Sequence, residues 1–151
     1  FTREADGSDI GNTYVEVDLS RQYMWYYQDG QVMFESNLVS GNLAEGALTN
    51  VGVGSILSKE RDSTLKGENF DGVSNYETPV KYWMHIGRDG EGFHDGWWRG
   101  AFGGVIYQTD GSHGCLNLPE ETARMMFEMV EHNTPVVVYE SSTNFSPPMT
   151  Y

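Results

Sequence analysis

The sequence predicts a mostly β fold, a β-sandwich or small barrel, with one main helix placed after the sole cysteine, Cys115. Short segments that alternate in polarity, or that concentrate aromatic and β-branched residues, recur from residue 14 onward, and such segments are typical of strands. A single segment, 119–131, has the spacing of an amphipathic helix. Because the strands do not alternate with helices, we expect mainly antiparallel pairing and not a parallel α/β sheet.

The first three predicted strands are 14–19, 22–27 and 31–40. Asp29 and Gly30, between the second and third strands, form a dipeptide that is typical of a two-residue hairpin. The turn-rich residues 41–54 lead into a short predicted strand at 55–58. No helix pattern follows the Gly-x-Gly run at 52–54, so we reject a dinucleotide-binding loop.

Charged and polar residues dominate the segment 59–78, which we interpret as a long surface loop interrupted by Gly67 and Gly72. Such a loop is more often a tolerated insertion than a functional lid. Strand character returns at 79–86 and again at 91–94.

The predicted helix at 119–131 begins with Pro119, a residue favoured in a first turn, and continues with two glutamates at the positive end of the helix dipole. Its apolar residues are spaced as one buried face, which we assign to the core: Ala123, Met126, Phe127 and Val130. Residues 133–135 end the helix, and a buried strand is predicted at 136–139.

The 151 residues suit one domain, which we place at 13–140, with a linker end at 1–12 and a polar tail at 141–151. The 22 acidic and 9 basic residues give a formal net charge of −13. This charge argues against nucleic acid as a partner, because binding to a phosphate backbone depends on Lys and Arg. No apolar run approaches the length of a membrane span. Because the chain starts at Phe1 without a signal peptide or anchor, we interpret it as an excised, monomeric domain of a longer protein.

Cys115 has no disulfide partner within the chain, so it can act as a nucleophile, a metal ligand or a redox-sensitive group. The alternative is that it is a small buried hydrophobe. Gly111 and Gly114 flank Ser112 and His113 directly before it. A backbone with these glycines suits the close approach of another molecule better than a packed core, so we favour a reactive thiol.

A cysteine nucleophile needs a base, because a thiol with the ordinary cysteine pKa of about 8.5 is only slightly ionised at neutral pH. Of the four histidines, His132 is expected to lie at the end of the helix, where a cation is favourable, and His85 to pack within a strand. His94 and His113 remain. His113 is two residues from Cys115 without necessarily facing it, and His94 must come from another strand, so the spacing leaves both bases open.

Half of the 18 glycines lie between Gly87 and Gly114. Glycine lets a ligand approach the backbone while aromatic rings form walls, which suits the rim of a pocket. The alternative, that the rings belong to the core and the glycines to turns, stays open. The aromatic residues in this region are Trp97, Trp98, Phe102 and Tyr107.

The segment 112–117, Ser-His-Gly-Cys-Leu-Asn, preceded by His94 across residues 95–111, resembles the signature of the L,D-transpeptidase catalytic domain, also called the YkuD domain. That signature is a histidine, a variable gap, and then Ser/Thr-His-Gly-Cys-hydrophobic-Asn or Arg. Thr49-Asn50-Val51-Gly52 departs from the Thr-Pro-x-Gly turn of many members. Further residues resemble the branch that cross-links peptidoglycan in Gram-positive bacteria: Tyr82, Trp83, Gly92, Phe93, Asp95, Trp97, Trp98, Gly103 and Gly104.

The resemblance implies that Cys115 is the nucleophile and that His94 is the base that forms an ion pair with it. It also implies that Ser112 orients the His94 ring, through its backbone carbonyl, as the third member of a triad. The competing interpretation, with His113 as the base, stays open.

The resemblance also implies an oxyanion hole built from the backbone N–H groups of His113, Gly114 or Cys115. His113 would line the site, and Asn117 would fix the loop by hydrogen bonds. The aromatic residues implied to bind substrate are Tyr82, Trp83, Trp97 and Trp98.

For function, the resemblance implies an extracytoplasmic cell-wall enzyme that needs no cofactor or metal. Cys115 would form a thioester with a tetrapeptide stem of peptidoglycan, and the amine of a second stem would resolve it into a cross-link. Carbapenem-type inhibitors would acylate the same cysteine. With water as the acceptor, the enzyme would be an L,D-carboxypeptidase. The remaining alternatives are a non-catalytic cell-wall-binding module and a metal site, which lacks paired ligand spacing, formed by His85, His94, His113 and Cys115.

Overall fold

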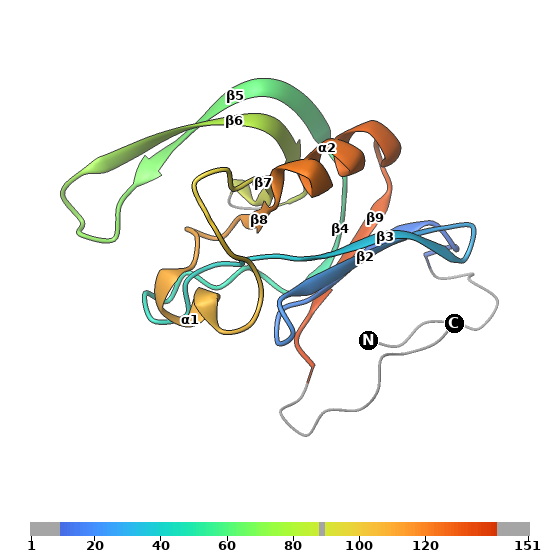
Figure 1. Cartoon of the computed structure of the whole chain (residues 1–151), viewed down its shortest axis with the longest axis horizontal. Coiled ribbons are helices and arrows are strands. Elements are labelled where there is room, and N and C mark those ends of the chain that lie inside the picture. Colours follow the sequence, from blue (N-terminus) through green and yellow to red (C-terminus); the bar gives the residue numbers. More distant parts are fainter. Residues whose placement is uncertain (1–9, 88–89, 142–151) are drawn as a thin grey trace.

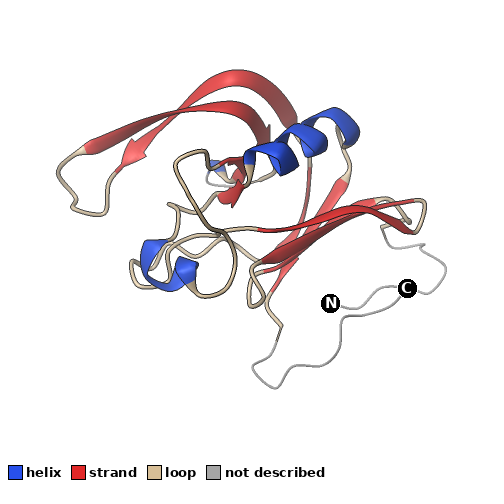
Figure 2. Cartoon of the chain, viewed as in Figure 1, coloured by secondary structure: helices blue, strands red, loops and turns tan. Residues whose placement is uncertain are grey.

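The computed structural model describes residues 10–87 and 90–141 and has the mostly β architecture that the sequence predicts. Two sheets enclose a shared apolar core (Figure 1), and strands are the predominant regular secondary structure of the described chain (Figure 2). One sheet has the strand order β3-β2-β1-β9-β4 and the other β5-β6-β7-β8. The strands are β1 (Tyr14–Asp18), β2 (Tyr23–Gln28), β3 (Gln31–Asn37), β4 (Gly52–Ser55), β5 (Ser58–Glu68), β6 (Asn75–His85), β7 (Gly92–Asp95), β8 (Leu116–Leu118) and β9 (Pro135–Tyr139). The helices are α1 (Ile106–Asp110) and α2 (Glu120–Met129).

The first three strands follow the sequence-based prediction closely. β2 and β3 form an antiparallel hairpin, and its turn residues Asp29 and Gly30 have φ angles of 50° and 83°, as the predicted two-residue turn requires. β3 ends at Asn37, three positions before the predicted end at residue 40. Beyond it, Val39 forms a bridge to Asn117 and Gly41 forms a bridge to Ser112. The residues that follow β3 therefore hold the segment around Cys115 by backbone pairing.

The predicted surface loop at 59–78 is wrong, because these residues form most of the hairpin β5–β6. The two strands pair with each other over ten positions and arch away from the rest of the molecule (Figure 1). Most positions are exposed or half-buried on both faces, so the strands carry little of the apolar alternation by which a strand is recognised. Gly72, with a φ of 71°, lies in the turn. Gly67 lies within β5, paired with Tyr76, and the Tyr76 phenol occupies the space that a Cβ at residue 67 would need.

Two smaller elements also differ from the prediction. The short strand expected at 55–58 begins earlier and ends earlier, as β4 (Gly52–Ser55), where it pairs with β9. Helix α1 was not predicted, because its five residues are too few to show helical periodicity.

Helix α2 is the predicted amphipathic helix and packs against β6 and β7. Ala123, Met126 and Val130 are fully buried in the core between the sheets. The Lys59 ammonium donates hydrogen bonds to the carbonyls of Phe127 and Val130 at 2.9 and 3.0 Å. Lys59 thus supplies the cation expected at the end of this helix, a place that the sequence assigned to His132.

A parallel pair, β7 with β8, brings the two parts of the signature together. Phe93 pairs with Leu116 and His94 pairs with Asn117. Cys115 is the last residue of the loop before β8, so it lies beside the strand that carries His94 despite the distance between them in the sequence. No helix in the described part of the chain is long and apolar enough to cross a membrane.

Candidate active site

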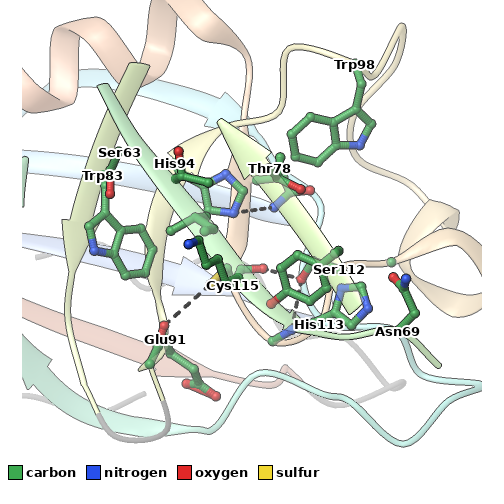
Figure 3. Close-up of a pocket in the computed structure, with 18 of the residues that line it drawn as sticks. Ser63, Asn69, Thr78, Trp83, Glu91, His94, Trp98, Ser112, His113 and Cys115 are labelled. Atoms are coloured by element: carbon green, nitrogen blue, oxygen red, sulfur yellow. Dashed lines mark hydrogen bonds between the residues drawn. The ribbon is translucent and has the colours of Figure 1, made fainter. Parts of the chain in front are cut away.

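A cavity of about 590 Å³ lies between the β5–β6 hairpin and the loop that leads into β8. Its walls include hairpin residues from Ser63 to Thr78 and residues of the segment 110–117. Figure 3 shows His94 and Cys115 directed into this cavity, with Trp83 and Glu91 beside them. The hairpin that was predicted to be a loop is therefore a wall of the site.

The Cys115 thiol is held in its neutral form. Its Sγ donates to the Gly90 carbonyl oxygen at 3.6 Å. The pKa of Cys115 is raised to about 11, mainly by burial; a hydrogen bond from the Gly92 backbone offsets part of the rise, and the neighbouring Glu91 carboxylate adds to it. At neutral pH the sulfur therefore keeps its proton.

The His94 ring is also neutral and is fixed at both nitrogens. The side chain is buried, with 4% exposure, and burial lowers its pKa. Nδ1 donates to the carbonyl oxygen of Asp95 at 2.9 Å, and the Asn117 amide Nδ2 donates to Nε2 at 3.2 Å. Since Asn117 Oδ1 accepts a hydrogen bond from Arg99 Nε at 2.9 Å, the amide can present only its NH₂ group to the ring. This arrangement leaves the lone pair on Nε2, the form of imidazole that can accept a proton.

Two expectations about the triad need correction. Within the described residues, the Cys115 thiol forms its hydrogen bond with the Gly90 carbonyl and none with His94, so the expected Cys115–His94 pair is not hydrogen-bonded in this structure. The Ser112 carbonyl does not orient the His94 ring. It accepts the Asn42 N–H at 2.9 Å, and the carbonyl of Asp95 takes the orienting position instead.

Ser112 instead braces the turn that carries the nucleophile. Its Oγ accepts the Gly114 N–H at 3.1 Å and donates to the Cys115 carbonyl at 2.5 Å. The Gly114 backbone has a φ of 131°, a region that favours glycine, and its carbonyl accepts from Thr49 Oγ1 at 2.7 Å. Of the amides expected in the oxyanion hole, that of Gly114 is thus engaged by Ser112 in this state.

His113 lines the cavity on the side of the hairpin tip. Its ring stacks on Phe70 with centroids 4.2 Å apart and contacts Tyr76 at 4.4 Å. Burial lowers the pKa of His113. The His113 ring therefore links the cysteine-bearing loop to the hairpin. The ring that is buried and bonded to Asn117 is the other candidate base, His94.

The four aromatic residues expected to bind substrate divide into two pairs. Trp83 and Trp98 line the cavity. Tyr82, the neighbour of Trp83 on β6, points to the opposite face and packs on Phe127 with centroids 5.4 Å apart, because successive strand residues face opposite sides. Trp97 is 56% exposed, and its Nε1 donates to the Pro79 carbonyl at 2.8 Å. Neither Tyr82 nor Trp97 lines this cavity, and substrate binding by Trp97, whose ring contacts that of Trp98, stays a prediction.

His85 packs against Trp83 with ring centroids 6.0 Å apart, which is the packed position expected for it. Within residues 10–87 and 90–141, no three His, Cys, Asp or Glu side chains come together in an arrangement that could hold a metal ion.

The family model of the L,D-transpeptidase catalytic domain, YkuD, matches residues 12–138. The chain belongs to this family. The sequence-based recognition of the family and of its mostly β fold is thereby confirmed. No curated protein matches the chain.

Solved structures of L,D-transpeptidases resemble the chain over most of its length. A mutant of the Enterococcus faecium L,D-transpeptidase is 45% identical, with a TM-score of 0.80, over 86% of this chain and 50% of that one. The isolated catalytic domain of the E. faecium enzyme acylated by ertapenem is 48% identical, with a TM-score of 0.74, over 85% of this chain and 97% of that one. A Mycobacterium smegmatis L,D-transpeptidase, 22% identical with a TM-score of 0.73 over 85% of this chain and 58% of that one, shares the fold. The chain thus spans half the length of the longer E. faecium protein.

Sequence reasoning about this L,D-transpeptidase domain missed two charged residues of the cavity. The Glu91 carboxylate lies beside Cys115 and accepts hydrogen bonds from the backbone N–H and side-chain amide of Asn50, at 3.0 and 2.9 Å. Asn50 stands where many members carry proline, which has no N–H to donate. Arg99 lies in a glycine-rich loop that shows no strand or helix periodicity. The one signal that could have drawn attention to it is that it is a cation between the two parts of the signature, His94 and Ser112.

Proposed function

We propose that this domain is an L,D-transpeptidase that cross-links peptidoglycan outside the cytoplasm, through a thioester on Cys115. One observation carries the proposal: the sole cysteine, in the loop directly before β8, and a buried histidine on the neighbouring strand β7 line one cavity. The similarity to an E. faecium catalytic domain that ertapenem acylates supports it.

In the acylation step, Cys115 Sγ attacks the carbonyl carbon of the third residue of a tetrapeptide stem. A bond between sulfur and carbon forms, and the bond from that carbon to the nitrogen of the fourth residue breaks. The thiol proton passes to His94 Nε2 and from there to the departing amine. Burial raises the pKa of the thiol and lowers that of the imidazole, which favours proton transfer from Sγ to Nε2 during the attack over a preformed ion pair.

In the second step, the amine of a neighbouring stem attacks the thioester carbon. A bond between nitrogen and carbon forms, the bond to sulfur breaks, and His94 carries the amine proton to the departing sulfur. The neutral thiol is restored. Water in place of the amine gives the carboxypeptidase reaction. The Asp95 carbonyl holds the ring through Nδ1 for both transfers, and Nε2 gives up its hydrogen bond from Asn117 when it takes the proton. Ser112 and Gly114 hold the turn that carries the sulfur.

Intact-mass spectrometry with ertapenem tests the assignment of the nucleophile. We expect one covalent equivalent on the wild-type domain and no rapid adduct on Cys115→Ser or His94→Ala. An unchanged mass of the wild-type domain after long incubation would contradict the proposal. A defined tetrapeptide stem, incubated with and without an acceptor amine, then separates cross-linking from hydrolysis by the mass of the product.

A further inference from the structure

Arg99 is an almost completely buried cation in the wall of the cavity. Its side chain is 8% exposed. In a chain with a formal net charge of −13, a basic residue in this position is unusual. Burial of an arginine is unfavourable unless its donors are used, and here burial lowers the pKa of the guanidinium. The desolvation of Arg99 is therefore unfavourable unless its donors find partners, in the protein or in a ligand.

The donors of Arg99 are only partly used by the protein. Nε donates to Asn117 Oδ1 at 2.9 Å, and Nη1 donates to the Asp110 carbonyl at 2.7 Å. The Asp110 carboxylate is 3.7 Å from Nη1 and is 85% exposed, so it is a weak, solvated partner. Among the described residues, Nη2 has no hydrogen-bond partner, and its two N–H groups belong to a residue that lines the cavity. The guanidinium is thus held by Nε and Nη1 and keeps the other part of its fork for a ligand.

The place of this free fork relative to His94 defines the group that it can bind. The Asn117 amide spans the gap between them, with 3.2 Å from its nitrogen to His94 Nε2 and 2.9 Å from its oxygen to Arg99 Nε. In the proposed reaction, Nε2 gives its proton to the amine of the departing fourth residue. In an α-amino acid the amine and the carboxylate are both bonded to the α-carbon. When the amine of the fourth residue lies at His94 Nε2, the carboxylate of that residue therefore lies close by.

We propose that Arg99 binds the terminal carboxylate of the donor stem and thereby selects stems that end at the residue being expelled. This inference rests on the proposed function and adds a binding subsite to it. An arginine fork and a carboxylate form charge-assisted hydrogen bonds, which are stronger than those to a neutral amide. A stem that continues beyond the fourth residue, or that ends in a carboxamide, offers no anion at this position.

Lys66 provides the matched control because it is a second cation of the same cavity. It differs in being largely exposed, at 68%, and in facing Glu77 at 3.8 Å. A general effect of positive charge on an acidic protein would involve both cations, whereas a built subsite involves Arg99 alone.

The experiment compares two donors that differ in one group: a tetrapeptide stem with a free C-terminal carboxylate and the same stem with a C-terminal carboxamide. The rate of release of the fourth residue, expressed as kcat/KM, is measured for wild type, Arg99→Gln and Lys66→Gln. For wild type we expect a preference for the carboxylate on the order of 10- to 100-fold, the effect of a hydrogen bond to a charged group. Arg99→Gln should bring the ratio of the two donors close to one, and Lys66→Gln should keep the wild-type ratio.

The ratio within one variant is the decisive quantity, because Arg99→Gln also removes the bond to Asn117 and can slow both donors through His94. If Arg99→Gln slows both donors by the same factor and the ratio stays at the wild-type value, Arg99 acts only by positioning Asn117, and the proposal is overturned. Equal rates of both donors on wild type overturn it too. Arg99→Lys, which keeps the charge without the fork, should give an intermediate ratio and replaces Arg99→Gln if the latter does not fold. Failure of the proposed function is a different result: neither donor nor ertapenem modifies the wild-type domain.

Discussion

Raising the pH across the neutral range should speed the alkylation of Cys115 by iodoacetamide tenfold per pH unit, without a plateau between pH 6.5 and 9.5. Iodoacetamide reacts with the thiolate, so its rate follows the fraction of ionised sulfur. Burial raises the pKa of Cys115 from 9.0, close to the pKa of about 8.5 of a free thiol, to about 11. Because both values lie above pH 7.5, the folded site holds about 100-fold less thiolate than an unburied cysteine at that pH.

A thiolate of higher pKa is intrinsically more nucleophilic, by about 6- to 10-fold for a rise of this size. At pH 7.5 the folded domain should therefore react about 10- to 15-fold more slowly than the same chain unfolded in urea. The assay is the time course of carbamidomethylation followed by mass spectrometry. The pH slope matters more than the absolute rate, since limited access to the sulfur lowers the rate at every pH equally. A rate that is already constant below pH 7 would reveal a thiolate–imidazolium pair and would refute the neutral resting state.

The remaining predictions concern catalytic pH dependence, folding and the hairpin. The acid limb of the kcat/KM profile should lie below pH 6.5, because burial lowers the pKa of the histidine base and so keeps it neutral, and able to accept a proton, at more acidic pH. Lys59→Met removes the cation at the end of α2 and should lower the free energy of unfolding in urea by about 1 kcal/mol; an unchanged midpoint would contradict this role. Gly41→Ala places a Cβ 1.7 Å from the Ala47 carbonyl oxygen and should cost about 3 kcal/mol or more, so that a stable variant would show that the site support can shift. Phe70→Ala removes the ring stacked on His113 and should speed amide exchange at the hairpin tip about fivefold, whereas unaltered protection would show that the stacking does not hold the hairpin.

The parts of the fold that could be predicted are those whose residues pack on the core. The sequence of β1 alternates in polarity, with Val15 and Val17 in the core, and α2 presents Ala123 and Met126 to the interior at helical spacing. The hairpin β5–β6 could not be recognised in this way, because its strands bond mainly to each other and face solvent on much of both sides. Its stability comes from backbone pairing, which leaves little trace in the choice of side chains.

For the site, the segment around Cys115 could be identified because a sole thiol, its flanking glycines and a histidine occur in a recognisable order. The role of Ser112 could not, because it depends on which carbonyl a folded ring meets, and that carbonyl belongs to Asp95. The division between Trp83 and Tyr82 follows from the alternation of β6, but the sequence does not say which side of the strand faces the cavity. The contact of Arg99 with Asn117 could not be predicted, because no sequence pattern marks Arg99 and only the folded loop brings the two residues together.

The pairing of β1 with β9 affects how the chain can fold. These strands come from opposite ends of the described sequence and lie parallel, with Val15 opposite Val136 and Val17 opposite Val138. Since β9 also pairs with β4, the middle of the five-stranded sheet stays open until nearly the whole chain is available. During synthesis, β1 must wait for a partner that follows every other strand of the domain, so we expect the domain to acquire its structure late and in one step rather than by stepwise growth.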